Sequence, residues 1–308
     1  VACGTAYHAS LYAQYLLRTW INQPIYCISA SEFRYGNYRI DENTLCIFVS
    51  QSGETADTLA ALKLSKENKA QTLSVTNVLG SSLARLSDFV LYTCAGPEIA
   101  VASTKAYTTQ LVLLACLCLK LASLCNGVVE NQNHMIDQLK QMPEVVEEML
   151  QQEDKMAEFA KLLTNQKDAY FIGRQLDYLS VLEGALKLKE VSYVHADAYM
   201  AGELKHGPIA LIEKDTVVIA LATQPSVAQK TISNILETVA RGAKVILITS
   251  KNQNADGFEY VIRIPDVDPL LSCIPATVLL QELAYYVAKE KGCDVDKPRN
   301  LAKSVTVE

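Results

Sequence analysis

The stretch LCIFVSQSGETADTLAALKLSK, residues 45–66, decides the fold class. It opens on the apolar run 45–49, which predicts a buried strand because the run is too short for a helix and turn-forming residues follow it at once. A polar turn, residues 50–55, then leads into a helix with Leu59, Leu62 and Leu64 near helical spacing. A strand, a turn and a helix in direct succession are typical of an α/β protein with a parallel sheet.

The turn SQSGET, residues 50–55, predicts an anion-binding site. A turn that enters a helix aims hydroxyls and free backbone N–H groups at one point, at the positive end of the helix dipole. The alternative is that Ser52 or Thr55 only caps the helix, as such residues often do. Several polar side chains together with Gly53, which permits close backbone approach, favour a phosphate. The spacing is not that of a Walker loop.

The chain contains two successive series in which short apolar runs alternate with helical patterns, and this repetition indicates an internal duplication. In the first copy we expect a strand ending at 1–5, a helix at 6–20, strands at 25–29, 45–49, 71–76 and 89–93, and a long helix to about 124. In the second copy we expect strands at 168–173, 216–222, 244–249 and 260–264, and helices at 178–191 and 274–291. Either Ser103 or Thr104 can cap the long helix or face a ligand.

This duplication predicts two domains and two smaller segments. The first domain is expected at residues 1–130 and the second at 166–292, with one or two connecting helices at 131–165 and a C-terminal tail at 293–308. The second copy has Ala222-Thr223-Gln224-Pro225-Ser226 where the first has SQSGET. Because it lacks the glycine and most of the hydroxyls, we expect only the first copy to hold phosphate.

The composition excludes several classes of function. A formal net charge of -6 and a pI near 5.4 argue against a nucleic-acid partner. The nine cysteines show no CxxC pair and the four histidines are scattered, so we expect no metal and no cofactor. The cysteines are typical of small buried hydrophobic residues in a reducing, cytoplasmic protein. The apolar run 111–119 is about half of a membrane span, so we expect a core helix and no membrane.

The chain starts without Met and directly before a strand ending, so we expect that a preceding segment has been removed. The tail 293–308 has the composition of a frayed terminus, but it is not of low complexity. It carries Lys303 between small residues.

The segment 183–190, EGALKLKE, predicts a cluster of titratable groups. Glu183, Lys187 and Glu190 fall on one helix face by their three- and four-residue spacing. On an arbitrary surface helix this would be a solvated salt-bridge stripe. Here the helix runs into a segment rich in titratable groups that ends with His206 in a turn before Gly207-Pro208. A carboxylate, a lysine and a histidine are the components of a proton-transfer site.

Six motifs together resemble one family, the isomerase half of the glutamine:fructose-6-phosphate aminotransferases, also called glucosamine-6-phosphate synthases. They are CGTAYH (3–8), SQSGETADT (50–58), VASTKAYTTQ (101–110), EGALKLKE (183–190), AGELKHGP (201–208) and DKPRNLAKSVTVE (296–308). The match covers essentially the whole chain in the right order. It implies two tandem flavodoxin-like SIS (sugar isomerase) domains, each a parallel sheet covered by helices on both faces. Full-length members also carry an N-terminal glutaminase domain.

The resemblance implies a sugar-phosphate site in the first domain. The phosphate would be held by Ser50, Gln51, Ser52 and Thr55, and the sugar would be lined by Thr5, Ala6, Val101, Ser103 and Ala302. The family commonly has serine at the position of Ala6, so a side-chain hydroxyl contact is lost there and only a backbone contact remains.

The resemblance also implies the chemistry, which is amination of fructose 6-phosphate coupled to isomerisation to glucosamine 6-phosphate. His206 would open the sugar ring, supplied by the neighbouring subunit of a homodimer with a shared active site. Glu190 would move a proton from C1 to C2, and Lys187 would relay protons or balance charge on O1. Lys303 would act as a Schiff-base partner or a charge stabiliser, on a tail that excludes water.

The implied function leaves alternatives that can be tested. Without a glutaminase the chain should not use glutamine, but it is expected to interconvert fructose 6-phosphate and glucose 6-phosphate. A non-catalytic SIS regulator that binds a sugar phosphate is the main alternative, and it predicts a degraded proton-transfer set. A deaminase running a related reaction in reverse is another, against which the motifs at 183–190 and 298–308 argue.

Overall fold

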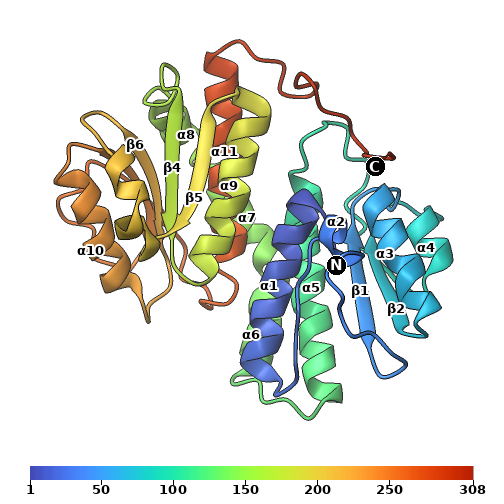
Figure 1. Ribbon diagram of the computed structural model, residues 1–308. Coiled ribbons are helices and arrows are strands. Elements are labelled where there is room, and N and C mark those ends of the chain that lie inside the picture. The colour runs from blue at the N-terminus through green and yellow to red at the C-terminus, as the bar shows by residue number, and fades with distance from the viewer. Residues whose placement is uncertain (308) are drawn as a thin grey trace. The chain divides into compact units, whose positions relative to one another are not determined.

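The computed structural model describes residues 1–307, which fold into two compact units (Figure 1). The first unit comprises Val1–Glu130 and the tail from Asn300 onward, and the second comprises Asn131–Arg299. Each is an α/β unit with a wholly parallel sheet. The expected α/β fold with two parallel sheets is therefore confirmed.

The sheet of the first unit is built on β1 (Leu45–Ser50), β2 (Gln71–Thr76) and β3 (Phe89–Tyr92), in that order. Val1 and Ala2 extend it beyond β1, because the N–H of Val49 donates to the carbonyl of Val1 at 3.1 Å. Ala2 in turn forms an isolated parallel bridge with Ser29. The order is thus the 2-1-3-4-5 arrangement of flavodoxin-like folds.

The two expected strands at 1–5 and 25–29 are wrong as full strands, since each is reduced to this one bridge. Helix α1 (Gly4–Trp20) already begins at Gly4, which has a left-handed φ of +54° and ends the extended backbone. On the other side, Pro24 has no N–H to donate to a sheet.

Helices cover both faces of the first sheet. They are α1, α2 (Ala30–Phe33), α3 (Ala56–Glu67), α4 (Ser82–Leu86) and α5 (Lys105–Leu124). Figure 1 shows α1 and α5 on one side and α3 and α4 on the other. Phe48 of β1 packs with Leu62 of α3 and Leu83 of α4 in a buried core.

Helix α5 is long and apolar enough to cross a membrane, judged by length and composition only. A core helix of a soluble protein meets the same test, so this is weak evidence. Here α5 packs along α1, with buried side chains such as Tyr107, Leu111 and Leu114.

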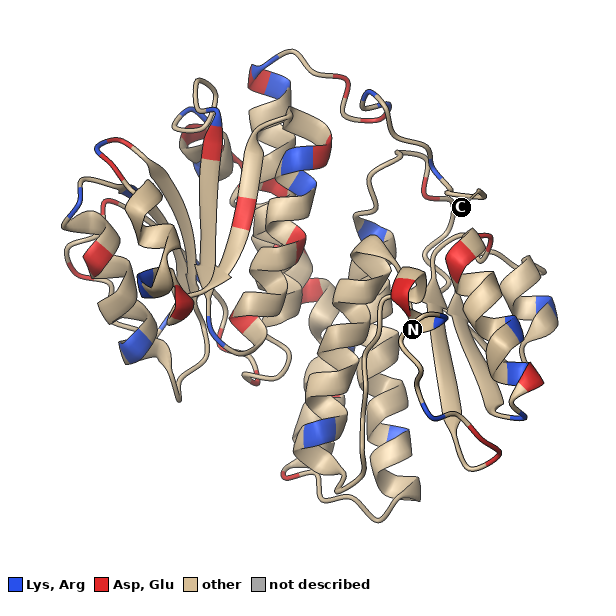
Figure 2. Ribbon diagram, in the orientation of Figure 1, with Lys and Arg blue, Asp and Glu red and all other residues tan. Residues whose placement is uncertain are grey.

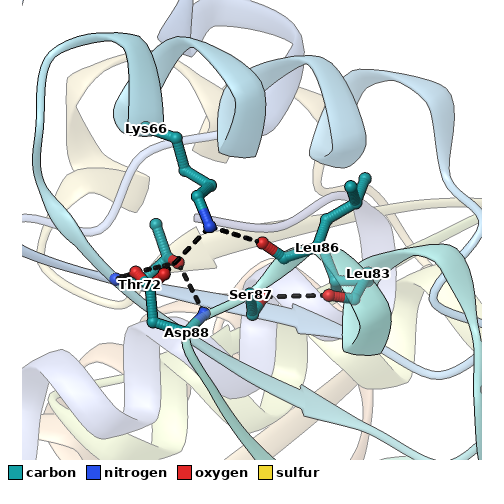
Figure 3. Close-up of polar contacts among 6 residues, drawn as sticks. All are labelled: Lys66, Thr72, Leu83, Leu86, Ser87 and Asp88. Carbon is teal, nitrogen blue, oxygen red and sulfur yellow. Dashed lines mark hydrogen bonds and ion pairs between the residues drawn. The ribbon is translucent and has the colours of Figure 1, made fainter.

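A polar clamp joins α3, β2 and the start of β3 (Figure 3). Lys66 Nζ lies 2.9 Å from Asp88 Oδ1 and also donates to the carbonyl of Leu86 at 2.9 Å. Asp88 Oδ2 accepts from the N–H and the hydroxyl of Thr72, at 2.9 and 2.7 Å. The hydrogen bond from Lys66, followed by those from Thr72, lowers the pKa of Asp88 to about 2. The clamp therefore holds an ionised carboxylate at the edge of the sheet.

The sheet of the second unit has five strands. In sheet order they are β5 (His195–Met200), β4 (Asp168–Gly173), β6 (Val217–Ala222), β7 (Lys244–Ser250) and β8 (Tyr260–Ile264). Every residue of β6 is buried, as expected for the central strand of a parallel sheet covered on both faces. This is the 2-1-3-4-5 order again.

Strand β5 was not among the strands expected from the sequence, which was interpreted here only as a segment rich in titratable groups. The segment alternates His195, Asp197 and Tyr199 with alanines, which is the period of two of a strand. It forms the edge of the sheet, where polar side chains reach water. The high content of titratable residues therefore did not distinguish this strand from a loop.

Helices also cover both faces of the second sheet. Figure 1 shows α9 (Leu176–Ser192) and α11 (Cys273–Glu290) on one side and α10 (Ala228–Val239) on the other. Two short 3-10 helices, η1 (Glu203–His206) and η2 (Pro208–Leu211), follow β5. Residues 131–165 form three helices rather than one or two, namely α6 (Gln132–Lys140), α7 (Met142–Leu150) and α8 (Glu153–Ala160), and α7 and α8 pack on α11.

The cysteines were expected to be buried, and only three of them are, Cys46, Cys118 and Cys273. Cys94, Cys116 and Cys125 are exposed, and all nine thiols are free. The interpretation of the cysteines as buried residues is therefore confirmed for these three and wrong for the three exposed ones, while Cys3, Cys27 and Cys293 are half-buried, because apolar sequence neighbours do not fix which way a side chain points.

Candidate active site

The SQSGET turn is held together by its own hydroxyls. Ser50 Oγ accepts a hydrogen bond from the N–H of Gly53 at 3.0 Å and lies 3.3 Å from Thr55 Oγ1. Ser52 Oγ accepts from the N–H of Glu54 at 3.2 Å. Thr55 occupies the N-cap position of α3, but its hydroxyl makes no capping hydrogen bond. The alternative prediction, in which Ser52 or Thr55 only caps α3, is therefore wrong.

Gly53 is required in this turn for two reasons. Its φ is +68°, in the left-handed region that favours glycine. A Cβ at this position would also come within 2.2 Å of Ser81 Oγ. Any other residue would therefore strain the backbone and push against the neighbouring loop.

The turn is also anchored to the next strand and helix. The carbonyl of Gln51 accepts from the N–H of Asn77 at 3.1 Å, just past the end of β2. Glu54 Oε1 accepts from the N–H of Ser82, the first residue of α4, at 2.8 Å. That hydrogen bond lowers the pKa of Glu54 and keeps the carboxylate engaged with α4.

The C-terminal tail lies on the same turn. Ser304 Oγ is 3.2 Å from Ser52 Oγ, and the carbonyl of Val305 accepts from the N–H of Ala56, the first residue of α3, at 3.1 Å. The sequence did not identify Ser304 or Val305 as part of this region, because no local pattern shows that residues 250 positions apart will meet. The tail therefore covers the N-terminus of the helix at which an anion would bind.

Lys303 ties the tail to a second loop of the first unit. Its Nζ donates to the carbonyl of Ala100 at 2.6 Å, next to the predicted sugar-lining residue Val101. Ala302 is exposed, whereas Val101 and Ser103 are half-buried. Lys303, Ala302, Val101 and Ser103 thus belong to two segments that the Lys303–Ala100 hydrogen bond joins.

The start of α5 is capped by a residue that the sequence did not suggest. Thr104 is at the N-cap position and makes no side-chain capping bond. Instead Glu98 Oε2 accepts from the N–H groups of Thr104 and Ala106, at 3.3 and 2.9 Å. The carboxylate is favourably placed at the positive end of the helix dipole. Ser103 is therefore not needed as a cap.

Thr5 and Ala6 lie in the first turn of α1, at the same sheet edge as the SQSGET turn. Val1 and Ala2 run parallel to β1, so the chain leaves the sheet at Cys3 where β1 leaves it at Ser50. The carboxyl ends of parallel strands, where the helix N-termini also gather, form the usual ligand-binding edge of such folds. The predicted phosphate and sugar residues of the first unit therefore share one edge.

In the second unit, Lys187 is buried between two carboxylates of its own helix. Its Nζ lies 3.4 Å from Glu183 Oε1 and 2.5 Å from Glu190 Oε2. Glu183 is fully buried, whereas the Glu190 side chain is 21% exposed. Figure 2 shows both basic and acidic segments on α9. The stripe predicted from spacing is real, but it is buried rather than solvated.

The charge state of Lys187 follows from this arrangement. Burial alone lowers the pKa of a lysine, but the two neighbouring carboxylates outweigh it, and the pKa of Lys187 is raised. Lys187 is therefore an ammonium group at neutral pH, with one buried counter-ion, Glu183, and one accessible partner, Glu190.

His206 is exposed at the end of η1, which follows β5. The turn that carries it packs on Arg174 at the end of β4, because a Cβ on Gly202 would come within 2.9 Å of Arg174 Nη2. Arg174 Nη2 also donates to Asn234 Oδ1 on α10 at 2.8 Å. Gly207, with φ +146°, then allows the sharp turn into Pro208. Arg174 and Gly202 thus fix the approach to His206.

The structure does not bring His206 to Glu190 within the second unit. Helix α9 begins at the carboxyl edge of the sheet and runs back, so Glu190, fourteen residues into α9, lies about 20 Å along the helix from that edge. His206 follows β5 and lies at the carboxyl edge. No hydrogen bond or ion pair joins the two residues within the described chain. The predicted proton-transfer set is therefore split, with Lys187 and Glu190 together and His206 at the opposite end.

Comparison with known proteins identifies the family that this fold and these sites define. The model of the SIS domain matches residues 1–120 and again residues 162–285, so the chain belongs to the SIS domain family and contains two such domains.

Within this family the chain is similar to the glutamine–fructose-6-phosphate aminotransferases (isomerizing). It is 52% identical to that of Clostridium acetobutylicum over 314 residues, which cover 100% of this chain and 51% of the relative. It is 47% identical to that of Thermococcus kodakarensis over 310 residues, covering 100% of this chain and 52% of the relative. The chain spans about half the length of the curated relatives it matches.

One solved structure shows which half is matched, and a second is similar in fold. The C-terminal domain of glucosamine-fructose-6-phosphate aminotransferase from Francisella tularensis superposes with a TM-score of 0.92 at 40% identity, covering 96% of this chain and 85% of that one. Glucosamine-6-phosphate deaminase from Thermotoga maritima gives 0.79 at 25% identity, covering 99% and 88%. The resemblance to the C-terminal isomerase half is therefore confirmed, and the other half of the full-length relatives has no counterpart in these residues.

Proposed function

We propose that this chain carries out the sugar-isomerising half of glucosamine 6-phosphate synthesis, converting fructose 6-phosphate and ammonia to glucosamine 6-phosphate and water. The observation that carries the proposal is Lys187, which is buried between Glu183 and Glu190. A buried ammonium beside a partly exposed carboxylate is a costly arrangement that a purely structural helix does not need.

The first unit supplies the phosphate anchor in this proposal. Ser50, Gln51, Ser52 and Thr55 line a glycine-containing turn at the N-terminus of α3, which suits a phosphate. Ser304 lies against Ser52, so we add it to the residues that the ligand would contact. Thr5, the backbone of Ala6, Val101, Ser103 and Ala302 would line the sugar.

The second unit supplies the proton transfer. Ammonia adds at the C2 carbonyl of the opened sugar and water leaves, which gives an imine. Glu190 removes a proton from C1 and returns it to C2, while Lys187 relays the proton of O1 or balances the charge on O1. The product is the 2-amino aldose. Lys303 supports this step from the tail, as a Schiff-base partner or a positive charge.

Ring opening requires a proton at the ring oxygen, and His206 is the proposed donor. Because His206 and Glu190 lie at opposite ends of the second unit, one chain's His206 cannot serve its own Glu190. This supports a homodimer in which His206 of one chain completes the site of the other.

We further propose that ammonia reaches this chain from a glutaminase domain in the full-length protein, and that the protein acts in the cytoplasm. The functional division would follow 1–130 for the phosphate-binding domain, 166–292 for the proton-transfer domain, 131–165 for the connector and 293–308 for the tail. All nine thiols are free, which is in keeping with that compartment.

The test is a coupled assay of the chain with fructose 6-phosphate, with and without ammonium. Appearance of glucose 6-phosphate without ammonium, and of glucosamine 6-phosphate with it, is the expected result. Fructose 6-phosphate binding with no turnover under either condition would favour the alternative, a non-catalytic regulator of the SIS family. The intact Glu183–Lys187–Glu190 array argues against that alternative.

A further inference from the structure

The two units contain the same strand–turn–helix element with the same spacing. In the first unit, six-residue β1 and twelve-residue α3 are joined by residues 51–55. In the second, six-residue β6 and twelve-residue α10 are joined by residues 223–227. The turn after β6 is therefore the structural counterpart of the proposed phosphate-binding turn, position for position.

A carboxylate of the chain itself occupies the donors of this second turn. Asp177 Oδ2 accepts from the N–H of Thr223 at 2.8 Å and from that of Gln224 at 3.4 Å. Asp177 Oδ1 accepts from the hydroxyl of Thr223 at 2.5 Å. Two successive backbone N–H groups and a hydroxyl that converge on one anion are the features of a phosphate-type site.

Asp177 reaches the turn from a position that also has a counterpart in the first unit. It is the second residue of the 17-residue helix α9, as Thr5 is the second residue of the 17-residue helix α1. The first unit thus has a short hydroxyl at the place from which the second unit extends a carboxylate.

The site around Asp177 is closed to solvent. Asp177 is 1% exposed, and Thr223, Gln224 and Ser272 are each 3% exposed or less. Ser272 fixes the donors, since its Oγ lies 3.0 Å from Thr223 Oγ1 and accepts from Gln224 Nε2 at 2.8 Å. No ion pair reaches Asp177 within residues 1–307. Burial raises the pKa of Asp177 to about 6, while the bonds from Thr223 and Gln224 oppose the rise, so the group is an anion at neutral pH.

We propose that the turn after β6 is a second anion site of the same design, and that its resident ligand is the Asp177 carboxylate, which excludes external phosphate and leaves one sugar-phosphate site per chain. The inference goes beyond the proposed function, because it holds whether or not the first turn binds a sugar phosphate. It also gives a role to a turn that has the length of its counterpart but Pro225 at the position of Gly53.

Chemical rescue tests this inference. Asp177→Ala removes the carboxylate and leaves a space that formate fits, whereas Asp177→Asn fills the same space without charge. We expect the melting temperature of Asp177→Ala to fall by several degrees, and formate to raise it more than chloride does at equal ionic strength. Wild type and Asp177→Asn should respond equally to the two salts. A formate response that is absent from Asp177→Ala, or equal in all three proteins, would overturn the proposal.

Titration of the wild-type protein gives an independent test that needs no variant to fold. Equilibrium binding of fructose 6-phosphate should saturate at one molecule per chain. Two molecules per chain would overturn the resident-carboxylate proposal. If fructose 6-phosphate did not bind at all, the proposed function would be contradicted. The formate experiment with Asp177→Ala would then still decide the role of Asp177.

Discussion

Lys187 Nζ lies 2.5 Å from Glu190 Oε2, and the two side chains differ in their access to solvent, at 3% and 21% exposure. The lysine is enclosed by α9 and its neighbours, but the carboxylate has one side open. A ligand would therefore meet Glu190 first, with the ammonium directly behind it. This asymmetry supports the proposed roles, in which Glu190 abstracts the proton and Lys187 supplies the neighbouring charge.

Replacement of the proposed base gives the first prediction. Glu190→Gln keeps the shape of the side chain but cannot accept a proton, so turnover of fructose 6-phosphate should fall by roughly 10²–10⁴-fold. Binding of fructose 6-phosphate, measured by calorimetry, should stay within a factor of a few. Glu144→Gln, at an exposed position of α7, is the matched control and should leave both unchanged. If Glu190→Gln turned over fructose 6-phosphate at the wild-type rate, Glu190 would not be the base.

Removal of the buried lysine separates stability from chemistry. Lys187→Met removes the ammonium that lies beside the buried Glu183, so the free energy of unfolding should fall by roughly 3–5 kcal/mol. Adding Glu183→Gln should restore most of that loss, because the buried carboxylate is replaced by a neutral amide, but turnover should not return. Denaturant unfolding and the coupled assay measure the two effects. Recovery of activity in the double variant would show that Lys187 has no role in the chemistry.

Much of the fold could be predicted because its signals are local. The bounds of β2, β4 and β8 follow directly from short apolar runs between turn formers, as does the spacing of Lys187 and Glu190 on one helix face. The sequence also showed that the second turn had lost its glycine. These are properties of residues within a few positions of one another.

What could not be predicted depends on long-range contacts. The Ser304–Ser52 contact joins segments 252 residues apart, and nothing local to either segment specifies it. The sequence did not identify Asp177, because a single aspartate in the first turn of a helix is typical of a residue that only interacts with the helix dipole. Its role appears only when the turn after β6 is placed beside it. Strand β5 was missed because its polar residues suited a catalytic loop equally well.

The clamp of Figure 3 predicts an acid-sensitive contribution to stability. The pKa of Asp88 is lowered to about 2 in the folded protein, so the folded state binds fewer protons than the unfolded chain between about pH 4 and pH 2. The stabilisation is therefore complete above that window and is lost as the pH falls through it. Because Asp88 is 38% exposed, solvent screens its pairing with Lys66, so the stabilisation is smaller than that of a buried ion pair.

Asp88→Asn should accordingly lower the free energy of unfolding at pH 7 by about 1–2 kcal/mol. The difference from wild type should shrink as the pH falls towards 2. Asp137→Asn breaks an exposed pair with Lys140 on α6 and should change stability by at most about 0.5 kcal/mol. Urea unfolding at several pH values measures this, and a pH-independent effect of Asp88→Asn would contradict the assignment.

The phosphate turn can be tested at Gly53. Gly53→Ala combines a left-handed backbone with a Cβ 2.2 Å from Ser81 Oγ, so the turn must shift and fructose 6-phosphate binding should weaken at least about tenfold. Gly80→Ala is the matched control, since φ is +66° there and no atom lies within 4 Å of the added Cβ. It should cost only about 1 kcal/mol of stability and leave binding intact. If both variants bound fructose 6-phosphate equally well, the phosphate would not bind at the turn that contains Gly53.

Mixed dimers test whether the active site is shared. Within the second unit, Glu190 lies at one end of α9 and His206 at the opposite edge of the sheet, so the proposed site would need two chains. His206→Ala and Glu190→Gln should each be inactive alone. When they are mixed and allowed to exchange subunits, half of the dimers carry one intact site, and activity should recover to about a quarter of wild type. Lys187→Met mixed with Glu190→Gln should stay inactive, because both residues belong to the same site. Recovery in that second mixture, or none in the first, would contradict a shared site.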